Sequence, residues 1–212
     1  MQNLPPIAFT SELRAIMASR LAGMSPIQGQ PTPGLKAAAV AIVVTPCDQG
    51  HAHFLLTVRA SRPGRHSGQF ALPGGVIEPG ETPDAAARRE CQEEIGLHLA
   101  EDSLLGRLDD YETRSGYVIA PHVYWSPGLA ELNPDPHEVA LVKHVPLTVL
   151  NAPGSPVLEP GDTPGRPILR LSVGEDNLHA PTAALLYQFR EVALHGRYLS
   201  VAHFDQPEFA RR

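Results

Sequence analysis

Cysteine is scarce in this 212-residue chain, and long apolar runs are absent. The two cysteines, Cys47 and Cys91, have no spacing that indicates a disulfide framework or a thiolate metal site. No segment approaches the roughly 18 consecutive apolar residues of a membrane span, and no basic stretch precedes an apolar run and a cleavage site. Disulfide-stabilised and membrane-spanning classes are therefore not expected, and we predict a cytoplasmic protein.

Positively charged residues are also few. The chain has 17 Lys and Arg against 23 Asp and Glu, a net charge of −6. Nonspecific nucleic-acid binding, which depends on the release of counterions from phosphates, is not expected. A small phosphate-bearing ligand stays compatible, because a metal ion and local arginines can reverse the field at one site. The length and a hydrophobic content of 42% fit one well-buried domain.

The most informative stretch is Gly75–Leu97, GVIEPGETPDAAARRECQEEIGL. Thr82 suits an N-cap, Pro83 suits the first helical position, and Gly96 supplies a stop. These signals predict a helix over Pro83–Ile95.

Three carboxylates share one face of that helix, because Glu90, Glu93 and Glu94 stand at i, i+3 and i+4. Two carboxylates about 6 Å apart repel by roughly 3 kcal/mol at the effective dielectric of a cleft. A solvated surface face tolerates that repulsion, whereas a partly enclosed site needs cations, and Mg²⁺ prefers such oxygen ligands.

The whole spacing, G-x5-E-x7-R-E-U-x-E-E-x-G-U with U apolar, resembles the signature of the Nudix hydrolases. The positions that carry it are Gly75, Glu81, Arg89, Glu90, Cys91, Glu93, Glu94, Gly96 and Leu97. Only Cys91 differs from the usual aliphatic residue, and a small buried cysteine suits an apolar position.

The resemblance implies Mg²⁺ or Mn²⁺ held by Glu90, Glu93, Glu94 and the backbone carbonyl of Gly75. It also implies that Glu93 or Glu94 activates or orients the attacking water. Arg89 would then hold a glutamate in place, and Glu81 and Gly96 would be structural members of the motif.

The preceding stretch, LLTVRASRPGRHSGQFALPGG from Leu55 to Gly75, resembles the extra signature of the coenzyme A diphosphatase branch, L-L-T-x-R-[SA]-x3-R-x3-G-x3-F-P-G-G. Gly64 stands where that pattern has its second Arg, with Arg65 beside it, and Leu72 replaces its Phe. Arg59, Arg65 and Gly74 are the expected substrate-binding residues. The arginines of this loop either clamp phosphates or simply solvate it.

Glu138 lies just before a late strand, where it is either an additional base or ligand, or a surface residue. His122, His137, His144 and His179 have no metal-ligand spacing and are interpreted as structural or surface residues. At the start of the last helix, Thr182 and Ala183 match the tail of the coenzyme A branch.

Elsewhere, apolar periodicity predicts a helix from Thr10 or Ser11, with Leu13, Ile16, Met17 and Leu21 as its apolar residues, and another over Thr182–His195. Strands are expected at Lys36–Thr45, His53–Arg59, Ser103–Asp109, Tyr117–Trp125, Val139–Pro146 and Ile168–Val173. Pro121 suggests an edge position or a bulge, and 148–165 should be irregular.

This interspersed pattern indicates an α/β or α+β fold, which the resemblance sharpens to the Nudix fold, a mixed β-sheet sandwiched between helices (α-β-α). We expect one domain overall, with an N-terminal helix and linker at 1–35 and the Nudix domain with its C-terminal helix at 36–212.

The implied substrate is a nucleoside diphosphate derivative, with coenzyme A first. ADP-ribose, another dinucleotide and a nucleoside triphosphate are the alternatives, and a non-catalytic nucleotide-binding module is a third class. No nucleic-acid or membrane partner is expected. A homodimer is compatible with the sequence, since the N-terminal helix and the Pro-rich segment could cover a partner.

Overall fold

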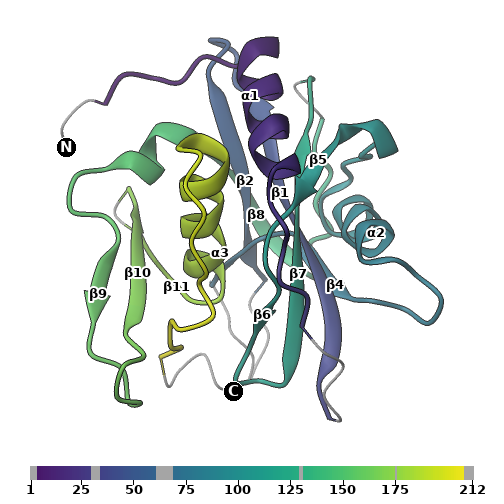
Figure 1. Ribbon diagram of the computed structural model, residues 1–212. Helices are drawn as coiled ribbons and strands as arrows, with labels where there is room; N and C mark the ends of the chain where they lie inside the picture. The colour runs from purple at the N-terminus through teal and green to yellow at the C-terminus, as the bar shows by residue number, and fades with distance from the viewer. Residues whose placement is uncertain (1–3, 30–33, 61–68, 129–130, 175, 208–212) are drawn as a thin grey trace.

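The computed structural model describes residues 4–29, 34–60, 69–128, 131–174 and 176–207 (Figure 1). The helices are α1 (Ser11–Ala22), α2 (Pro83–Ile95) and α3 (Thr182–Phe189), which a π-helical turn at Arg190–Leu194 extends, and 3-10 turns lie at Glu101–Ser103 and Leu147–Asn151. The strands are β1 (Lys36–Pro46), β2 (Ala52–Arg59), β3 (Phe70–Ala71), β4 (Gly74–Val76), β5 (Leu104–Arg107), β6 (Tyr111–Glu112), β7 (Tyr117–Trp125), β8 (Val139–Pro146), β9 (Val157–Glu159), β10 (Ile168–Val173) and β11 (Asp176–His179).

The main sheet is mixed. Its centre is the parallel pair β1 and β7, and its other pairings are antiparallel: β5 and β6 with β7, and β8 with β2. A separate antiparallel sheet has the order β11-β10-β9.

Strands β1 and β2 form a fork. They pair with each other only at Val44–Pro46 and Ala52–Phe54. Further along, β1 pairs with β4 and β2 pairs with β3, so the segment that contains β3 and β4 fills the space between the diverging strands. The Ala41 N–H donates to the Pro73 carbonyl at 2.9 Å and fixes the turn between β3 and β4. The glycine-rich turn is thereby built into the sheet.

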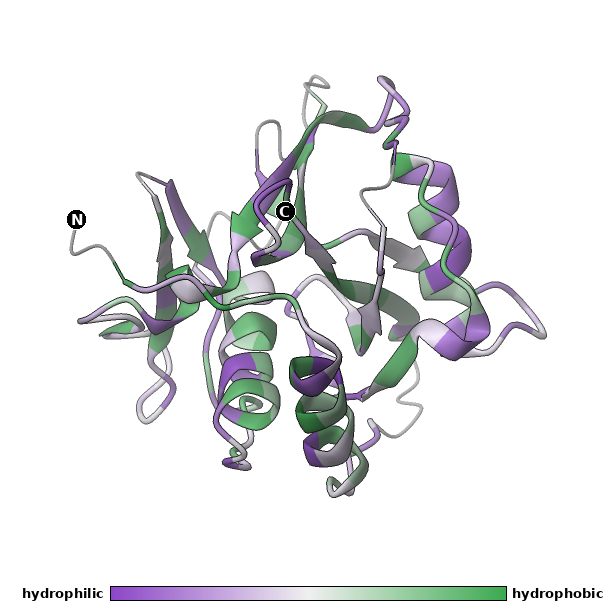
Figure 2. Cartoon of the chain, turned by 90° about the horizontal axis from the view of Figure 1, so that it is seen from above, coloured by the Kyte–Doolittle hydropathy of each residue, from purple (hydrophilic) through white to green (hydrophobic). Residues whose placement is uncertain are grey.

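Helices cover both faces of this sheet. Ala39, Ala41 and Val43 of β1 pack in one cluster with α2, and the alternate residues Ile42 and Val44 pack in the other with α1 and α3. Seen from above, α1 and α3 lie side by side, and α2 stands apart from them (Figure 2). The expected α-β-α arrangement is confirmed.

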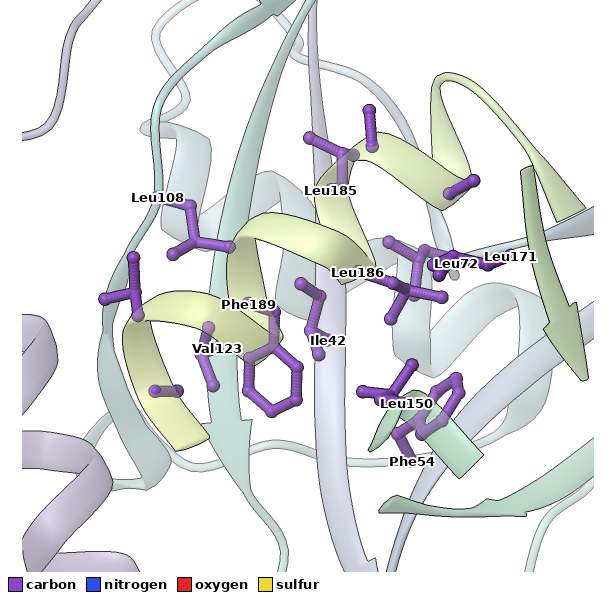
Figure 3. Close-up of a cluster of buried hydrophobic side chains, with 14 of the residues drawn as sticks. Ile42, Phe54, Leu72, Leu108, Val123, Leu150, Leu171, Leu185, Leu186 and Phe189 are labelled. Atoms are coloured by element: carbon purple, nitrogen blue, oxygen red, sulfur yellow. The ribbon is translucent and has the colours of Figure 1, made fainter. Parts of the chain in front are cut away.

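The α3 side holds the larger core. Leu186 and Phe189 of α3 lie near Ile42 of β1, and Phe189 lies near Val123 of β7 (Figure 3); Leu185 belongs to the same core. On the α2 side the contact residues are small: Ala39, Ala41, Ala86 and Ala87 are all fully buried. The helix can therefore lie close to the strands.

The end signals of α2 act as predicted. The Thr82 hydroxyl accepts from the Ala85 N–H at 3.2 Å, and Gly96 has a left-handed φ of 69° at the C-cap. Near the helix start, the Tyr124 hydroxyl of β7 donates to the Asp84 carboxylate at 2.8 Å. Both ends of α2 are thus fixed.

Several local expectations need correction. Pro121 does not lie at an edge, because β7 is an interior strand; it faces the gap between β5 and β6. The segment 148–165 contains β9, which forms by pairing with the distant β10. Ile16 is 38% exposed, because α1 buries only Met17 and Leu21 fully. None of the described helices is long and apolar enough to cross a membrane.

Candidate functional site

A cleft of about 990 Å³ opens beside the fork between β1 and β2. One part of its wall comes from α2 and the β3–β4 segment, and another comes from β11 and the start of α3. The carboxylate-bearing residues that line it are Glu90, Glu94, Glu138 and Asp176. The cleft therefore brings the central motif together with residues from the last third of the chain.

The two glycines of β4 allow the backbone to approach α2 closely. A Cβ added at Gly75 would lie 2.3 Å from the Glu90 carboxylate, and one at Gly74 would lie 2.3 Å from the Ala39 carbonyl. The Gly74 N–H donates to Glu94 at 3.1 Å. A side chain at either glycine would push the carboxylates or β1 away, so the contact requires glycine at both positions.

Arg89 organises the outer side of the same helix. Its guanidinium donates twice to Glu81, at 3.0 and 3.1 Å, and once each to Glu90 at 2.9 Å, Glu93 at 3.0 Å and the Val76 carbonyl at 3.0 Å. All of its donors are engaged. Arg89 thus fixes Glu90 against Gly75 and ties the helix to β4. It does not line the cleft.

Burial makes the inner carboxylates reluctant to ionise. It raises the pKa of Glu94 to about 7, with smaller raising effects from Glu90 and Glu138 that the nearby Arg59 opposes. Burial also raises the pKa of Glu90, and Arg89 lowers it in part. By contrast, the hydrogen bonds from Arg89 lower the pKa of Glu81. The anionic forms of Glu90 and Glu94 are therefore disfavoured where the cleft meets α2, and a cation bound there would stabilise them.

Glu138 reaches this end of the cleft through a loop anchored on α2. The Asn133 and Asp135 N–H groups donate to the carbonyls of Ile95 and Glu94, at 2.9 and 3.0 Å. At the end of β2, the Ala60 N–H donates to the Glu138 carbonyl at 2.9 Å. Glu138 is thereby held at the same cleft as Arg59.

The donor set suits Mg²⁺ or Mn²⁺. Within the described part of the chain, no three His, Cys, Asp or Glu side chains form a ready metal cage. Mg²⁺ does not need one, because it is usually bound by one or two carboxylates together with water and substrate phosphates. The paired carboxylates of Glu90 and Glu94 at the Gly74–Gly75 backbone fit that pattern.

The other predicted site residues are placed unevenly. Glu93 is 59% exposed, directed to Arg89, and absent from the cleft lining. Glu81 and Gly96 support the motif from outside the cleft, whereas Arg59, Gly74 and Gly75 line it. Arg65 and Gly64 lie outside the described residues.

Sequence reasoning missed the far wall of the cleft. His179, Asn177, Pro181 and Thr182 line it. His137 lines the cleft beside Glu138, although the sequence pattern favours a structural or surface role for both histidines. Only Thr182 had a signal, through the coenzyme A branch pattern. The pairing of β11 with β10 brings Asn177 and His179 there, and no local motif encodes that pairing.

The family model of the NUDIX domain matches residues 35–170, which is more than half of the chain. The chain belongs to the Nudix family. The segment Gly75–Leu97 is therefore its Nudix motif, and α2 is its Nudix helix.

Curated relatives match parts of this Nudix chain. The uncharacterized Nudix hydrolase NudL of Photorhabdus laumondii is 37% identical over 95 residues, which cover 44% of this chain and 51% of that protein. The mouse peroxisomal coenzyme A diphosphatase NUDT7 is 33% identical over 99 residues, covering 46% and 42%. The nucleoside triphosphatase NudI of an Enterobacter species is 47% identical over 57 residues, covering 27% and 40%. The chain thus spans about half or less of these relatives.

Proposed function

We propose that this chain is a metal-dependent pyrophosphohydrolase. Its substrate is coenzyme A or an acyl derivative, and water cleaves the diphosphate to give 3′,5′-ADP and 4′-phosphopantetheine or its acyl form. The observation that carries the proposal is a pair of carboxylates, the buried Glu94 and the partly buried Glu90, held against the Gly74–Gly75 backbone in a cleft that also contains Glu138.

Glu90 and Glu94, with the Gly75 carbonyl, would hold the metal. When bound, Mg²⁺ or Mn²⁺ supplies positive charge to the diphosphate oxygens and makes a water more acidic. Arg89 keeps Glu90 in position through its 2.9 Å hydrogen bond. Arg59, an exposed residue at the rim, is available to pair with a phosphate.

A carboxylate of the site must take the proton of the attacking water. Glu93, Glu94 and Glu138 are the candidates from the sequence. Glu94 and Glu138 line the cleft, whereas Glu93 points to Arg89. The geometry therefore favours Glu94 or Glu138, since a base must lie within hydrogen-bond reach of the proton it removes.

The preference for coenzyme A is supported by the Leu55–Gly75 signature and by the similarity to the mouse coenzyme A diphosphatase. The similarity to NudI favours a second candidate, a nucleoside triphosphate. ADP-ribose and other dinucleotides are further alternatives. The proposal includes a small nucleotide derivative rather than nucleic acid or membrane as the partner, and the cytoplasm as the location.

The test is product analysis with purified protein, comparing coenzyme A, acetyl-coenzyme A, ADP-ribose and a nucleoside triphosphate, each with Mg²⁺ and with Mn²⁺. We expect the highest kcat/KM for the coenzyme A compounds, with 3′,5′-ADP as a product. A preference for ADP-ribose or a triphosphate would contradict the coenzyme A assignment. No turnover of any of them would favour a nucleotide-binding module.

A further inference from the structure

The cleft has a second end that the proposed chemistry does not use. Ala38 and Val40 of β1 line it, and they alternate with Ala39 and Ala41, which pack under α2. Their side chains therefore project from the opposite face of the sheet. Ile119 of β7 is the register partner of Ala38 and shares that face.

Apolar side chains also form the wall above this floor. One side of the cleft is lined by Leu178 of β11, by Ala180 before α3, and by Leu185 of α3. The other side is lined by Phe70 and Leu72 of the β3–β4 segment. Leu72 and Leu185 also belong to the large core under α3 (Figure 3). This end is built into the fold and is continuous with the Glu90–Glu94 end.

The charges of the two ends differ. Among the described lining residues, Arg59 is the only Lys or Arg, and its field reaches Glu94 at the carboxylate end. At the apolar end the ionisable groups are Asp176 and His179, and burial lowers the pKa of His179, so its ring is uncharged near neutral pH. No Lys or Arg is among the described residues that line this end. Lys143, 4.6 Å from the centre of the Phe70 ring, does not line the cleft and is paired with Asp176 at 2.7 Å. This end therefore contributes no lining cation to a phosphate dianion.

The two halves of coenzyme A differ in the same way. The 3′-phosphoadenosine half has a phosphate beyond the diphosphate, whereas the pantetheine half is an uncharged chain of methylenes and amides. A cleft of about 990 Å³ is also larger than a diphosphate alone requires.

We propose that the apolar end of the cleft, with Val40 and Ile119 as its floor and Leu178, Ala180 and Leu185 as its wall, binds the pantetheine arm of the substrate. This inference rests on the proposed function and names the half of the molecule that each end takes. The 3′-phosphoadenosine half then lies toward Arg59. Ile119 is the specificity residue that can be altered with least effect on the glycine turn, because it lies on β7 and not beside Gly74.

The experiment measures the binding of the two products separately, by titration calorimetry with Mg²⁺ present. For Ile119→Trp, which fills the floor, we expect 4′-phosphopantetheine to bind at least ten-fold more weakly. For Ile119→Ala, which removes contacts without overpacking, we expect a loss of roughly four-fold or more, as for one methylene that is no longer buried. In both variants 3′,5′-ADP should bind within two-fold of wild type.

The matched controls are Ile16→Trp and Ile16→Ala. Ile16 is an exposed isoleucine of α1 outside the cleft, and its substitution should change neither affinity. If Ile119→Trp does not fold, Ile119→Ala decides the question alone.

Two failures can be told apart. A wild-type protein that hydrolyses ADP-ribose or a triphosphate but not coenzyme A overturns the proposed function and this inference with it. Hydrolysis of coenzyme A by the wild type, combined with Ile119 variants that weaken 3′,5′-ADP binding, both products equally or neither product, overturns the inference alone.

Discussion

Two helices of this protein contain an adjacent Arg–Glu pair, and the charge balance around the two pairs is opposite. Around Arg89 one guanidinium contacts three carboxylates, those of Glu81, Glu90 and Glu93. Around Glu191 one buried carboxylate contacts two guanidiniums, those of Arg190 and Arg197, at 2.8 and 2.7 Å.

The difference separates a structural network from a site. Arg190 also donates to the carbonyls of Leu150 and Ser155, both at 2.9 Å, and the described residues of this network do not line the cleft. In the Nudix helix all donors of Arg89 are engaged, whereas Glu94 faces the cleft and, within the described part of the chain, its carboxylate accepts the Gly74 N–H. A surplus of carboxylate directed into a cleft indicates cation binding, whereas a buried carboxylate that is fully paired with guanidiniums away from the cleft indicates structural support.

The largest expected effect is on catalysis. Glu94→Gln should lower metal-dependent kcat/KM at least about 100-fold, because it removes a charged ligand at the point where the diphosphate must be neutralised. Steady-state kinetics with saturating Mg²⁺ measure this, with circular dichroism as the check on folding. Near-normal activity of a folded Glu94→Gln protein would remove this carboxylate from the mechanism.

Glu93→Gln is the companion variant. A loss as large as that of Glu94→Gln would show that Glu93 turns from Arg89 to the metal when substrate binds. A loss of kcat/KM below ten-fold would indicate that Glu93 only holds Arg89 in position.

The second-largest expected effect is on stability, at the Glu191 network. Glu191→Gln should lower the free energy of unfolding by about 3 kcal/mol, because two arginines, one of them buried, lose their shared counter-charge. Urea unfolding measures the change. The folded variant should keep wild-type kcat/KM, since Glu191 is remote from the cleft lining. An unchanged midpoint of urea unfolding would mean that Glu191 does not hold a structural network.

The third expected effect is a gain in stability. In the metal-free protein at pH 8, Glu94→Gln should raise the free energy of unfolding by about 1–3 kcal/mol, since each unit of pKa shift corresponds to about 1.4 kcal/mol. Burial raises the pKa of Glu94 from 4.5 to about 7, so the folded state binds this proton more tightly than the unfolded chain. The stability that protonated Glu94 gives the folded state is fully present below pH 4.5 and is lost as the pH rises through about 7.

The gain in stability should therefore vanish near pH 4.5. Unfolding in EDTA at a series of pH values provides the measurement. Adding Mg²⁺ should narrow the gap at pH 8, because the cation stabilises only the wild-type carboxylate. If Glu94→Gln instead lowered the free energy of unfolding at pH 8, burial of the ionised Glu94 carboxylate would not be costly in the metal-free protein.

The smallest effect concerns an ion pair outside both networks. Lys143 of β8 contacts Asp176 of β11 at 2.7 Å, with side chains 36% and 40% exposed. Lys143→Met should change the free energy of unfolding by less than about 1 kcal/mol, because solvent screens such pairs. A change as large as that of Glu191→Gln would show that this contact holds the small sheet against the cleft. Urea unfolding in parallel with Glu191→Gln makes the comparison.

The sequence encodes the Nudix helix almost completely, because its determinants are local. Thr82, Pro83 and Gly96 act within a few residues of their position. The same holds for the contact between Arg89 and Glu93, which are one turn apart. The double contact of Arg89 with Glu81 depends on how the chain enters the helix, and spacing alone did not predict it.

The rest of the site depends on long-range pairing. β3 and β4 are too short to show a periodic pattern, and they exist because β1 and β2 diverge around them. β11 places Asn177 and His179 at the cleft through its register with β10. Neither pairing leaves a local pattern in the sequence. The positions of Asn177 and His179 at the cleft could therefore not be predicted from the sequence.

The four alanines at the contact between β1 and the Nudix helix have a consequence for how the cleft could be altered from a distance. Ala39, Ala41, Ala86 and Ala87 act as a spacer of minimal thickness, and the closeness of Glu90 to Gly75 depends on that thickness. An added methyl group anywhere in this layer would lift the helix as a whole, and the reactive groups with it. Residues that do not line the cleft would thereby set how close its carboxylates lie to the Gly74–Gly75 backbone.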